Sequence, residues 1–551
     1  MSRIYKIVGP PGTGKTTELA RQGRRAAEVH GGDGVAIVSL TRAAAAEIGG
    51  RDSGVPAENC TTLHAACYRA LDRPDLAETA DSMKEFAATS GYQVSSASST
   101  QALEDDPEPY SRYSQAEAGS ALHAVVANHR ARRTARAFWR QHEREYADAW
   151  DDFKRRTGRL DFTDLIERCL ADRVAHPAAP RVLLLDEAQD SSALELALAQ
   201  QWAADCETAV IVGDTDQALY TWRGSDPGVI DDMACAGART LEQSYRVPVA
   251  VHGAATRWIA QIPGRRDVVY RPTEIEGAVE RANISLRWAR DIAQLAHEKS
   301  KEGETQVLVS CSYMLSSLLA ELRAAGIPFH NPHRAKAGAW NPMRGAGPLK
   351  AFLRPLGEVW GEQARMWTWD DLRRWTDPLK ASDALARGAK AAIDEHCREG
   401  KFGESRADEE VPLETLRTLL GSDEHPAFTL DVDWWAARLR AGKTKSLAYA
   451  LAVLQAQGGR ALTQTPKLVV GTIHAAKGTE ADHVILAPDL SRTGYWEGWH
   501  SGGRGRDAIV RMFYVALTRA RHTVTVIEPS RPEHVDPYEL VAGAQTLRAA
   551  A

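Results

Sequence analysis

The chain has 551 residues, 44% of them hydrophobic and 26% charged, which is an ordinary globular composition spread over more than one hydrophobic core. Its 68 Lys and Arg residues nearly balance its 73 Asp and Glu residues, so a nucleic-acid surface can arise only from local clustering of charge. The seven cysteines contain no C-x-x-C pair, and no apolar run reaches the roughly 18 residues that span a bilayer. We therefore expect a cytoplasmic protein with no zinc site, disulfide framework, signal peptide or membrane segment.

The first motif is a glycine-rich loop that predicts a phosphate site. Residues 9–17 read GPPGTGKTT, follow an apolar run at residues 4–8 and precede a helical pattern at residues 17–29. In this context the loop backbone can donate N–H groups to phosphate, Lys15 can reach the β- and γ-phosphates, and the Thr16 hydroxyl can bind Mg²⁺. The alternative is a glycine-rich turn with a solvated lysine. We predict that ATP or another nucleoside triphosphate binds here through Gly9, Gly12, Thr13, Gly14, Lys15, Thr16 and Thr17.

Strand and helix patterns alternate around this loop. Apolar runs at residues 35–40, 181–185 and 208–213 predict buried strands, and helices are expected at residues 41–48, after Thr61 or Thr62, and from Asp161. Alternation of this kind is typical of an α/β fold with a mostly parallel sheet covered on both faces. Ligands of such sheets bind at the carboxyl ends of the strands, where the loop also lies.

Two of these strands end in polar residues suited to phosphate chemistry. Asp186 and Glu187 follow the run at 181–185, so Asp186 can hold Mg²⁺ and Glu187 can orient and deprotonate the attacking water. The run at 208–213 leads to Gln217, which can sense the γ-phosphate. An isolated Asp-Glu pair would more often be a helix start, but here it ends a hydrophobic strand in a chain with a phosphate loop.

Flat and basic side chains follow Gln217 directly. Tyr220 and Trp222 can stack on unpaired bases, and Arg223 lies beside them. The alternative is that both rings belong to the core.

Residues 71–158 lack strand patterns and are expected to form a helical insertion with an exposed loop at residues 95–109. One long helix is predicted from an apolar stripe that runs from Ala131 through Phe138 to Phe153. Arginines at positions 132, 136, 140 and 144 would form a basic face opposite that stripe. A merely solvated charged face is the alternative.

The order of these motifs resembles the UvrD/Rep type of superfamily 1A DNA helicases. The matching blocks are GPPGTGKTT (9–17), VSLTRAAAAEI (38–48), TTLHAACYRAL (61–71), VLLLDEAQD (182–190), VGDTDQALYTWRG (212–224), QSYRVP (243–248), VVGTIHAAKGTEADHVIL (469–486) and YVALTRAR (514–521). The resemblance implies two RecA-like motor domains with two mainly helical insertions. The expected ranges are 1–70 with 159–260, the first insertion 71–158, then 261–345 with 461–530, the second insertion 346–460, and a tail at 531–551.

The resemblance also implies residue roles. Arg246 and Arg519 would contact the γ-phosphate from opposite sides of a cleft, and Gly478 and Glu480 would approach the nucleotide, the glutamate at the ribose. The positions that would line a single-strand track are Thr41, His64, Tyr220, Trp222, Thr472 and His474. The family carries an adenine-reading segment before the phosphate loop, whereas this chain begins eight residues before Gly9, so a relaxed nucleotide preference is expected.

These features predict an ATP- and Mg²⁺-dependent translocase and helicase that moves 3′→5′ on single-stranded DNA and acts at junctions with duplex. The alternative is a nucleotide and DNA sensor or regulatory subunit of a nuclease or defence complex, without processive unwinding. A loader or a nuclease is the protein partner to be expected. In the second insertion, Trp367, Trp369, Trp375, Trp434 and Trp435 are assigned mainly to the core, and residues 501–506 (SGGRGR) to a flexible basic loop. A small-molecule kinase would leave the 212–224 and 514–521 blocks without a purpose.

Overall fold

The structure, a computed structural model, describes residues 3–39, 42–50, 53–94, 119–334, 337–355, 366–398 and 407–535. The chain divides into two compact units. The first comprises Met1–Ala282, Val309–Tyr313 and Thr472–Ala551, and the second comprises Asn283–Leu308 and Met314–Gly471. Among the described helices, none combines the length and the apolar character needed to cross a membrane.

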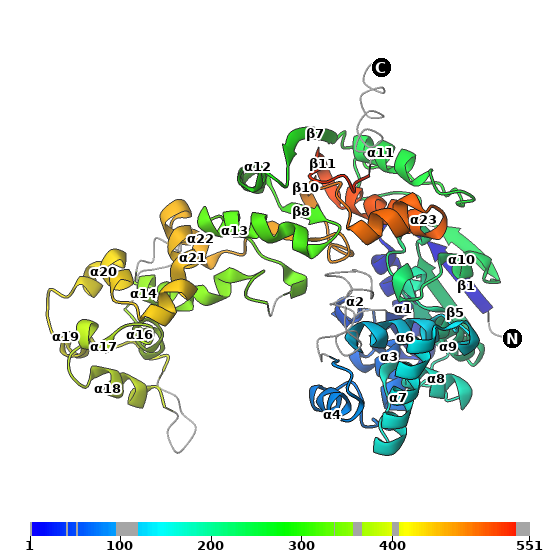
Figure 1. The fold of residues 1–551 in the computed structure, drawn as a ribbon, viewed down its shortest axis with the longest axis horizontal. Coiled ribbons are helices and arrows are strands. Elements are labelled where there is room, and N and C mark those ends of the chain that lie inside the picture. Colours follow the sequence, from blue (N-terminus) through cyan, green and yellow to red (C-terminus); the bar gives the residue numbers. More distant parts are fainter. Residues whose placement is uncertain are drawn as a thin grey trace. The chain divides into compact units, whose positions relative to one another are not determined.

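A six-stranded sheet organises the first unit (Figure 1). Its order is β3-β2-β4-β5-β1-β6, and every neighbouring pair runs parallel. The strands are β1 (Arg3–Val8), β2 (Val35–Ser39), β3 (Cys60–Thr62), β4 (Val182–Leu185), β5 (Thr208–Gly213) and β6 (Gly237–Thr240). Because β1 lies beside β5, with Val8 opposite Gly213, the loop after β1 and the segment that carries Gln217 leave the sheet together.

Helices cover both faces of this sheet. One apolar cluster joins the strands to α1 (Lys15–His30) and α2 (Arg42–Gly50) through Leu19 and Ile48. The opposite cluster joins them to α3 (Leu63–Ala70), α8 (Phe162–Ala171) and α9 (Ala193–Ala204). Of the two predicted caps, Thr62 caps α3 by accepting from the N–H of Ala65, and the helix predicted to start at Asp161 is capped by that residue. The predicted strands and the doubly covered parallel sheet are confirmed.

The single long helix predicted in the insertion is wrong. The chain instead forms α4 (Ala80–Ser90), α6 (Gly119–Ala131) and α7 (Gln141–Thr157), and it turns at Arg133, whose φ is 57°. The turn is closed by two hydrogen bonds, from Trp139 Nε1 to the carbonyl of Thr134 and from Arg144 to the carbonyl of Trp139. Phe138 is consequently 82% exposed instead of buried.

The four arginines therefore share no helix face. Arg132 donates to the carbonyl of Thr221, and Arg136 pairs with Asp148 at 2.5 Å. The insertion is held together by a buried aromatic core that contains Phe86, Tyr146, Trp150 and Phe153. The loop expected at residues 95–109 lies outside the described residues.

A second sheet has the order β7-β11-β10-β8-β9. Its strands are β7 (Ala278–Ser285), β8 (Thr305–Val309), β9 (Leu468–Thr472), β10 (Ala481–Leu486) and β11 (Ala520–Glu528), and β10 and β11 pair in parallel. Two sheets with flanking helices confirm the α/β class expected for two RecA-like domains. The first unit also contains α10 (Pro227–Asp232), α11 (Val249–Ile259), a π-helix η12 (Gly494–His500) and α23 (Gly503–Leu517). Because α23 begins at Gly503, the loop expected at residues 501–506 is largely helical.

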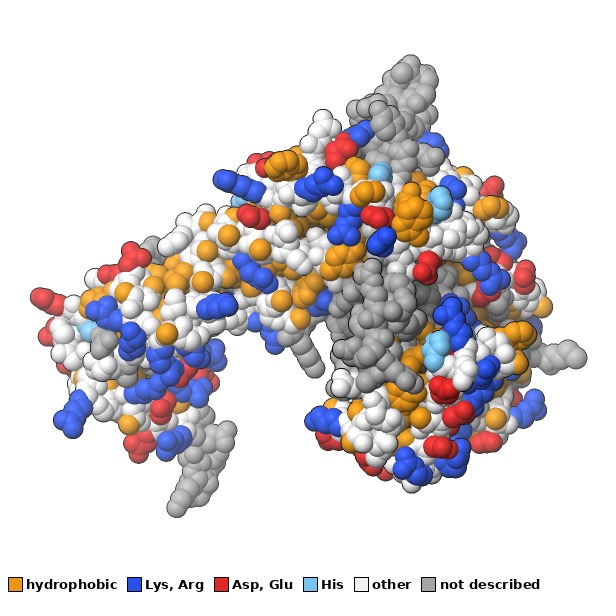
Figure 2. Space-filling model, viewed as in Figure 1, with side chains coloured by type: hydrophobic (Ala, Val, Ile, Leu, Met, Phe, Trp, Pro, Cys, Tyr) orange, Lys and Arg blue, Asp and Glu red, His pale blue; other side chains and the backbone are white. Residues whose placement is uncertain are grey.

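The second unit is rich in helices (Figure 1). They are α12 (Ala289–Glu302), α13 (Ser316–Ala324), α14 (Gly347–Leu353), α16 (Trp369–Thr376), α17 (Ala381–Ala384), α18 (Ala389–His396), α19 (Leu413–Leu420), α20 (Val432–Ala437), α21 (Ala441–Gln457) and α22 (Arg460–Thr463). Four of the five tryptophans are buried as predicted, with Phe352 between the rings of Trp367 and Trp435, whereas Trp434 is half-buried under Arg438. Figure 2 shows acidic and basic side chains interspersed over this lobe, where Arg440 pairs with Asp377 at 3.5 Å.

Candidate active site

A cavity of about 680 Å³ opens within the first unit, beyond the carboxyl ends of β1, β4 and β5. That volume lies in the usual range for small-molecule sites. Most of the residues predicted to bind nucleotide line it, although they come from both ends of the chain. The lining consists of Gly12, Thr13, Gly14, Lys15, Thr16, Thr17, Ser39, Ala44, Asp186, Glu187, Asp190, Gln217, Tyr220, Tyr245, Arg246, Lys477, Gly478, Glu480 and Arg519.

The glycine-rich loop owes its shape to close contacts. A Cβ on Gly9 would lie 2.3 Å from Cγ of Lys15, and one on Gly12, at φ +73°, would lie 2.6 Å from Cβ of Arg246. Helix α1 begins at Lys15, so its first free N–H groups point into the cavity, as anions require. Lys15 Nζ donates to the carbonyl of Gly9 at 2.6 Å, and burial lowers the pKa of its ammonium.

Asp186 provides a buried oxygen suited to a cation. Its N–H donates to the carbonyl of Val38, which fixes it at the end of β4, while Oδ1 is buried with no hydrogen-bond partner among the described residues. Burial, with the neighbouring charge of Glu187, raises the pKa of Asp186 to about 7. Leaving a carboxylate oxygen buried and unpaired is costly, so this oxygen and the nearby Thr16 hydroxyl fit Mg²⁺. Ser39, whose Oγ is also buried and has no hydrogen-bond partner in the described part of the chain, is a lining residue that sequence reasoning missed.

Glu187 occupies the left-handed region at φ 50°, which turns its carboxylate towards Lys477. The distance from Lys477 Nζ to Glu187 Oε2 is 3.5 Å, and Gln189 donates to the same oxygen. Burial on its own would raise the pKa of Glu187, but the charges of Lys477 and Lys15 lower it below its usual range. The predicted base is therefore ionised and held by a lysine.

Lys477 is the main functional candidate that the sequence analysis did not single out. Its ammonium also pairs with Asp190, donates to the carbonyl of Gln217 at 2.9 Å, and lies 5.7 Å from the centroid of the Tyr220 ring. Lys477 lies between His474 and Gly478 in the matched block at residues 469–486. Nothing in the sequence around it identifies its partners.

The two predicted arginines reach the same cavity. Arg519 is 2% exposed, and its Nη2 lies 3.3 Å from Gln217 Oε1. Burial, and then the charge of Arg246, lower the pKa of Arg519 to about 9. Arg246 Nε donates to Glu480 Oε2 at 2.6 Å, and Arg521 holds the other oxygen of Glu480 at 3.2 Å. Arg246, the predicted phosphate contact, and Glu480, the predicted ribose contact, thus form an ion pair with each other in this structure.

Tyr245 is another lining residue that the sequence analysis passed over. Its N–H donates to the carbonyl of Gly12 at 2.8 Å, which ties the 243–248 block to the phosphate loop, yet the residue is 78% exposed. An exposed ring at the mouth of a nucleotide cavity offers a flat face to a base. Its position directly before Arg246 in the sequence is the signal that could have identified it as a lining residue.

Of the residues predicted to contact DNA, only some lie close to one another, around Tyr220. The guanidinium of Arg223 lies 5.5 Å from the centroid of the Tyr220 ring, and the His474 ring lies 6.3 Å from it. Burial, with the charge of Lys477, lowers the pKa of His474 to about 4. The backbone of Trp222 belongs to a 3₁₀ turn, η7 (Thr221–Arg223), while its side chain and the whole of Thr41 lie outside the described residues.

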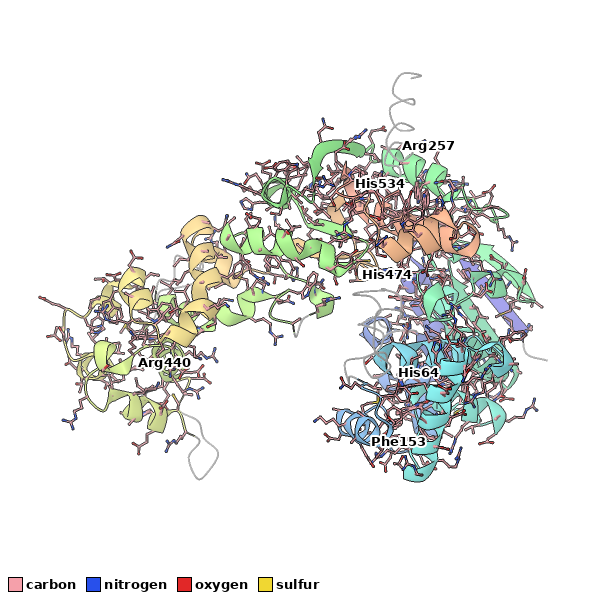
Figure 3. All side chains as sticks on the ribbon, viewed as in Figure 1. His64, Phe153, Arg257, Arg440, His474 and His534 are labelled. Atoms are coloured by element: carbon pink, nitrogen blue, oxygen red, sulfur yellow. The ribbon has the colours of Figure 1, made fainter. Side chains whose placement is uncertain are left out.

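The other two candidates have partners of their own. His64, which Figure 3 labels together with His474, lies 3.8 Å from Glu195 and packs edge-on against Phe162 at 6.0 Å. Thr472 is 3% exposed, and its hydroxyl accepts from the N–H of Ala475. Contact of either residue with DNA stays a prediction.

Comparison with known proteins agrees with this site. The family model described as "UvrD/REP helicase N-terminal domain" matches residues 2–235. ATP-dependent DNA helicase UvrD1 of Mycobacterium tuberculosis (strain ATCC 25618 / H37Rv) is 28% identical over 302 residues, 47% of this chain and 38% of that protein. DNA helicase II of Escherichia coli (strain K12) is 31% identical over 144 residues, 23% of this chain and 19% of that protein. ATP-dependent DNA helicase PcrA of Bacillus subtilis (strain 168) is 31% identical over 134 residues, 22% of this chain and 18% of that protein.

The matches to these three relatives span less than half of each relative. The family-model match, at residues 2–235, contains the phosphate loop, Asp186 and Glu187. Together with the motifs and the cavity, they lead to one conclusion. The chain is UvrD/REP-like, and its residues 2–235 match the model of the UvrD/REP helicase N-terminal domain.

Proposed function

We propose that the chain is an ATP-dependent DNA helicase that translocates 3′→5′ along single-stranded DNA. The observation that supports this most is one cavity lined by Lys15, Glu187, Arg246 and Arg519. Lys15 and the N–H groups of α1 would hold the phosphates, and the exposed Tyr245 would stack on the base. Stacking does not distinguish one base from another strongly, so we also propose a relaxed nucleotide preference.

Hydrolysis would use groups already in place around the triphosphate. Glu187 would accept a proton from the attacking water, and Gln217 would orient that water. Arg519 and Arg246 would spread positive charge over the oxygens of the transferring phosphoryl group. Arg246 must exchange Glu480 for phosphate to do so, so we propose that nucleotide binding breaks that pair.

Asp186 and Thr16 would hold Mg²⁺, which when bound would neutralise charge on the phosphates. Glu187 would act on the water, because the charges of Lys477 and Lys15 keep its carboxylate ionised against the effect of burial.

Coupling to DNA would run through the segment that begins at Gln217. Lys477 contacts Glu187, the carbonyl of Gln217 and the Tyr220 ring, so a base that stacks on Tyr220 would displace the lysine from the catalytic carboxylate. Trp222, Arg223 and His474 would extend this track, and Thr41, His64 and Thr472 would belong to it as well. We propose that two motor domains with the predicted ranges alternate their grip on the strand, and that the 3′→5′ direction follows that of the resembling family.

Strand displacement by the purified chain tests the proposal. Duplexes with a 3′ or a 5′ single-stranded tail, fluorescently labelled, are mixed with the chain, ATP and Mg²⁺. Release from the 3′-tailed duplex alone is the expected result, and release from the 5′-tailed duplex would refute the direction. DNA-stimulated hydrolysis without displacement on either substrate would instead favour a nucleotide and DNA sensor that regulates a protein partner such as a nuclease.

A further inference from the structure

Aromatic residues gather in the π-helix η12, Gly494–His500, whose sequence is GYWEGWH. π-Helical turns are rare and occur often at functional sites. Two glycines let η12 lie against α23. A Cβ on Gly498 would come within 2.7 Å of Ile509, and one on Gly505 would come within 3.0 Å of the carbonyl of Glu497. Neither glycine lines the nucleotide cavity, so the close packing of η12 against α23 points to a role outside that cavity.

One tryptophan anchors the π-helix. Trp499 stacks on the buried Trp258 of α11, with ring centroids 5.8 Å apart and an interplanar angle of 2°. The guanidinium of Arg506 lies 4.5 Å from the centroid of the Trp499 ring and donates to Gln261 at 3.1 Å. These contacts fix the segment in place without using its other rings.

The remaining rings form an outward surface, the η12 platform, made of Tyr495, Trp496 and His500. Trp496 is 50% exposed, and Tyr495 and His500 pack edge-on against it at 5.2 Å and 5.1 Å. These neighbours support the indole, and half of the tryptophan surface stays exposed. An exposed tryptophan buttressed in this way is typical of a surface that receives a flat partner.

Positive charge lies near the platform. The side chain of Arg504, at the start of α23, is 92% exposed and lies 3.5 Å from Asp226. Burial, followed by the charge of Arg504, lowers the pKa of Arg132, and the charge of Asp226 opposes that shift. Glu497 is the exposed acid within the π-helix itself.

Helix α23 links this surface to the nucleotide cavity. Arg511 on α23 donates to the carbonyl of Thr215 at 3.0 Å, two residues before Gln217. The same helix ends at Leu517, two residues before Arg519. A ligand that shifts η12 would therefore move α23 and alter the positions of Gln217 and Arg519, whose side chains lie 3.3 Å apart in the cavity.

We propose that the η12 platform, with Arg504, is a second stacking site for single-stranded DNA, separate from the Tyr220 group. The proposal rests on the proposed function, since it assigns part of the strand to a surface outside the predicted track. An exposed tryptophan and, eight residues further along the chain, an exposed guanidinium suit a base and the phosphate of a neighbouring nucleotide, without preference for sequence. A flat apolar protein surface would gain nothing from the exposed charge of Arg504.

Binding of a fluorescein-labelled oligo(dT) to the full chain, followed by anisotropy, tests the proposal. Trp496→Ala should weaken binding about 5- to 100-fold, as expected for the loss of one stacked base. Trp496→Phe should restore most of the affinity, whereas Trp496→Leu, which is apolar but has no π-face, should not. Trp288→Ala is the matched control, because Trp288 is 65% exposed and lies in the other unit.

Wild-type affinity in Trp496→Ala, or equal affinity in the Leu and Phe variants, would overturn the platform. If Tyr220→Ala weakens binding while Trp496→Ala does not, the platform fails and the proposed function stands. A wild-type chain that binds no oligonucleotide overturns both. Photocrosslinking of a 5-iodouracil oligonucleotide to the tryptic peptide of residues 493–504 would support the platform independently of any substitution, and crosslinks confined to the Tyr220 peptide would contradict it.

Discussion

Glu187 adopts a backbone conformation that non-glycine residues visit rarely, at φ 50°. Such strain costs on the order of 1–3 kcal/mol and persists mainly where function requires it. Glu187→Gln keeps the shape but removes the base, so we expect a loss of about 10²- to 10⁴-fold in DNA-stimulated ATP hydrolysis. Phosphate release measures the rate, and a fluorescent ATP analogue should still bind. Glu207→Gln, on the surface, is the control, and turnover within tenfold of wild type in Glu187→Gln would remove the assignment.

His176 makes a prediction about stability and pH. Its Nδ1 accepts from the N–H of Ala178, its ring packs edge-on against Trp202, and its Nε2 is buried without a partner among the described residues. Burial, and then the charge of Arg69, lower the pKa of His176 to about 4. The imidazole of His176 therefore binds a proton more readily in the unfolded chain than in the folded one. Its contribution to the stability of the fold is present above pH 6.5 and is lost as the pH falls from 6.5 towards 4.

We expect this histidine to contribute about 3 kcal/mol to the loss of unfolding free energy across that window. His176→Asn keeps an acceptor for the N–H of Ala178 but cannot be protonated, so its stability should fall less on acidification. Urea denaturation at pH 7 and pH 4.5, followed by tryptophan fluorescence, measures the difference. The exposed His142→Asn should behave as wild type, and an identical pH response in His176→Asn would contradict the argument.

At the scale of elements, Asp161 joins three helices. It caps α8, and it accepts from Arg130 on α6 at 2.7 Å and from Lys154 and Trp150 on α7 at 2.7 and 2.8 Å. Burial opposes the ionised form, yet the charges of Arg130 and Lys154 hold the pKa of Asp161 far below its usual range. This carboxylate therefore stabilises the fold at neutral pH, and the contribution is lost as the pH falls below about 4.

Asp161→Asn should lower the free energy of unfolding by about 3–5 kcal/mol at pH 7, because two buried cations lose part of their compensation. The gap between variant and wild type should narrow on acidification below pH 4. Chemical denaturation measures both quantities. Asp152→Asn removes an exposed pair with Arg155 at 2.6 Å and should change stability by less than about 0.5 kcal/mol. Equal losses of unfolding free energy in the two variants would show that the contacts of Asp161 with Arg130 and Lys154 do not stabilise the fold.

How far the sequence predicted these elements depends on the range of the contacts that shape them. The strand–loop–helix around Lys15 and the strand that ends at Asp186 follow from local spacing, and both were predicted. The break between α6 and α7 was not, because it contains neither Gly nor Pro and is closed by side-chain bonds such as that from Trp139 to Thr134. Lys477 was missed because its partners Asp190 and Gln217 lie 287 and 260 residues away.

At the scale of the whole molecule, the cavity is closed by distant parts of one chain. Lys15 and Glu187 belong to the segment that matches the family, whereas Lys477, Glu480 and Arg519 follow some 240 residues or more after its end at residue 235. Both sets lie in the first unit, although the second unit interrupts them in sequence. A complete site therefore requires the chain to fold back on itself.

If one chain supplies both walls, two inactive variants cannot repair each other. Lys15→Ala lacks the phosphate-binding ammonium and Arg519→Ala lacks the guanidinium beside Gln217, so each alone should lose at least about 10²-fold in hydrolysis. An equimolar mixture should remain as inactive as either variant over a wide range of protein concentration, measured by DNA-stimulated phosphate release. A mixture of wild type with either variant is the control and should show activity proportional to the wild-type chain. Recovery in the doubly variant mixture that grows with concentration would mean that Arg519 completes the site of a second copy.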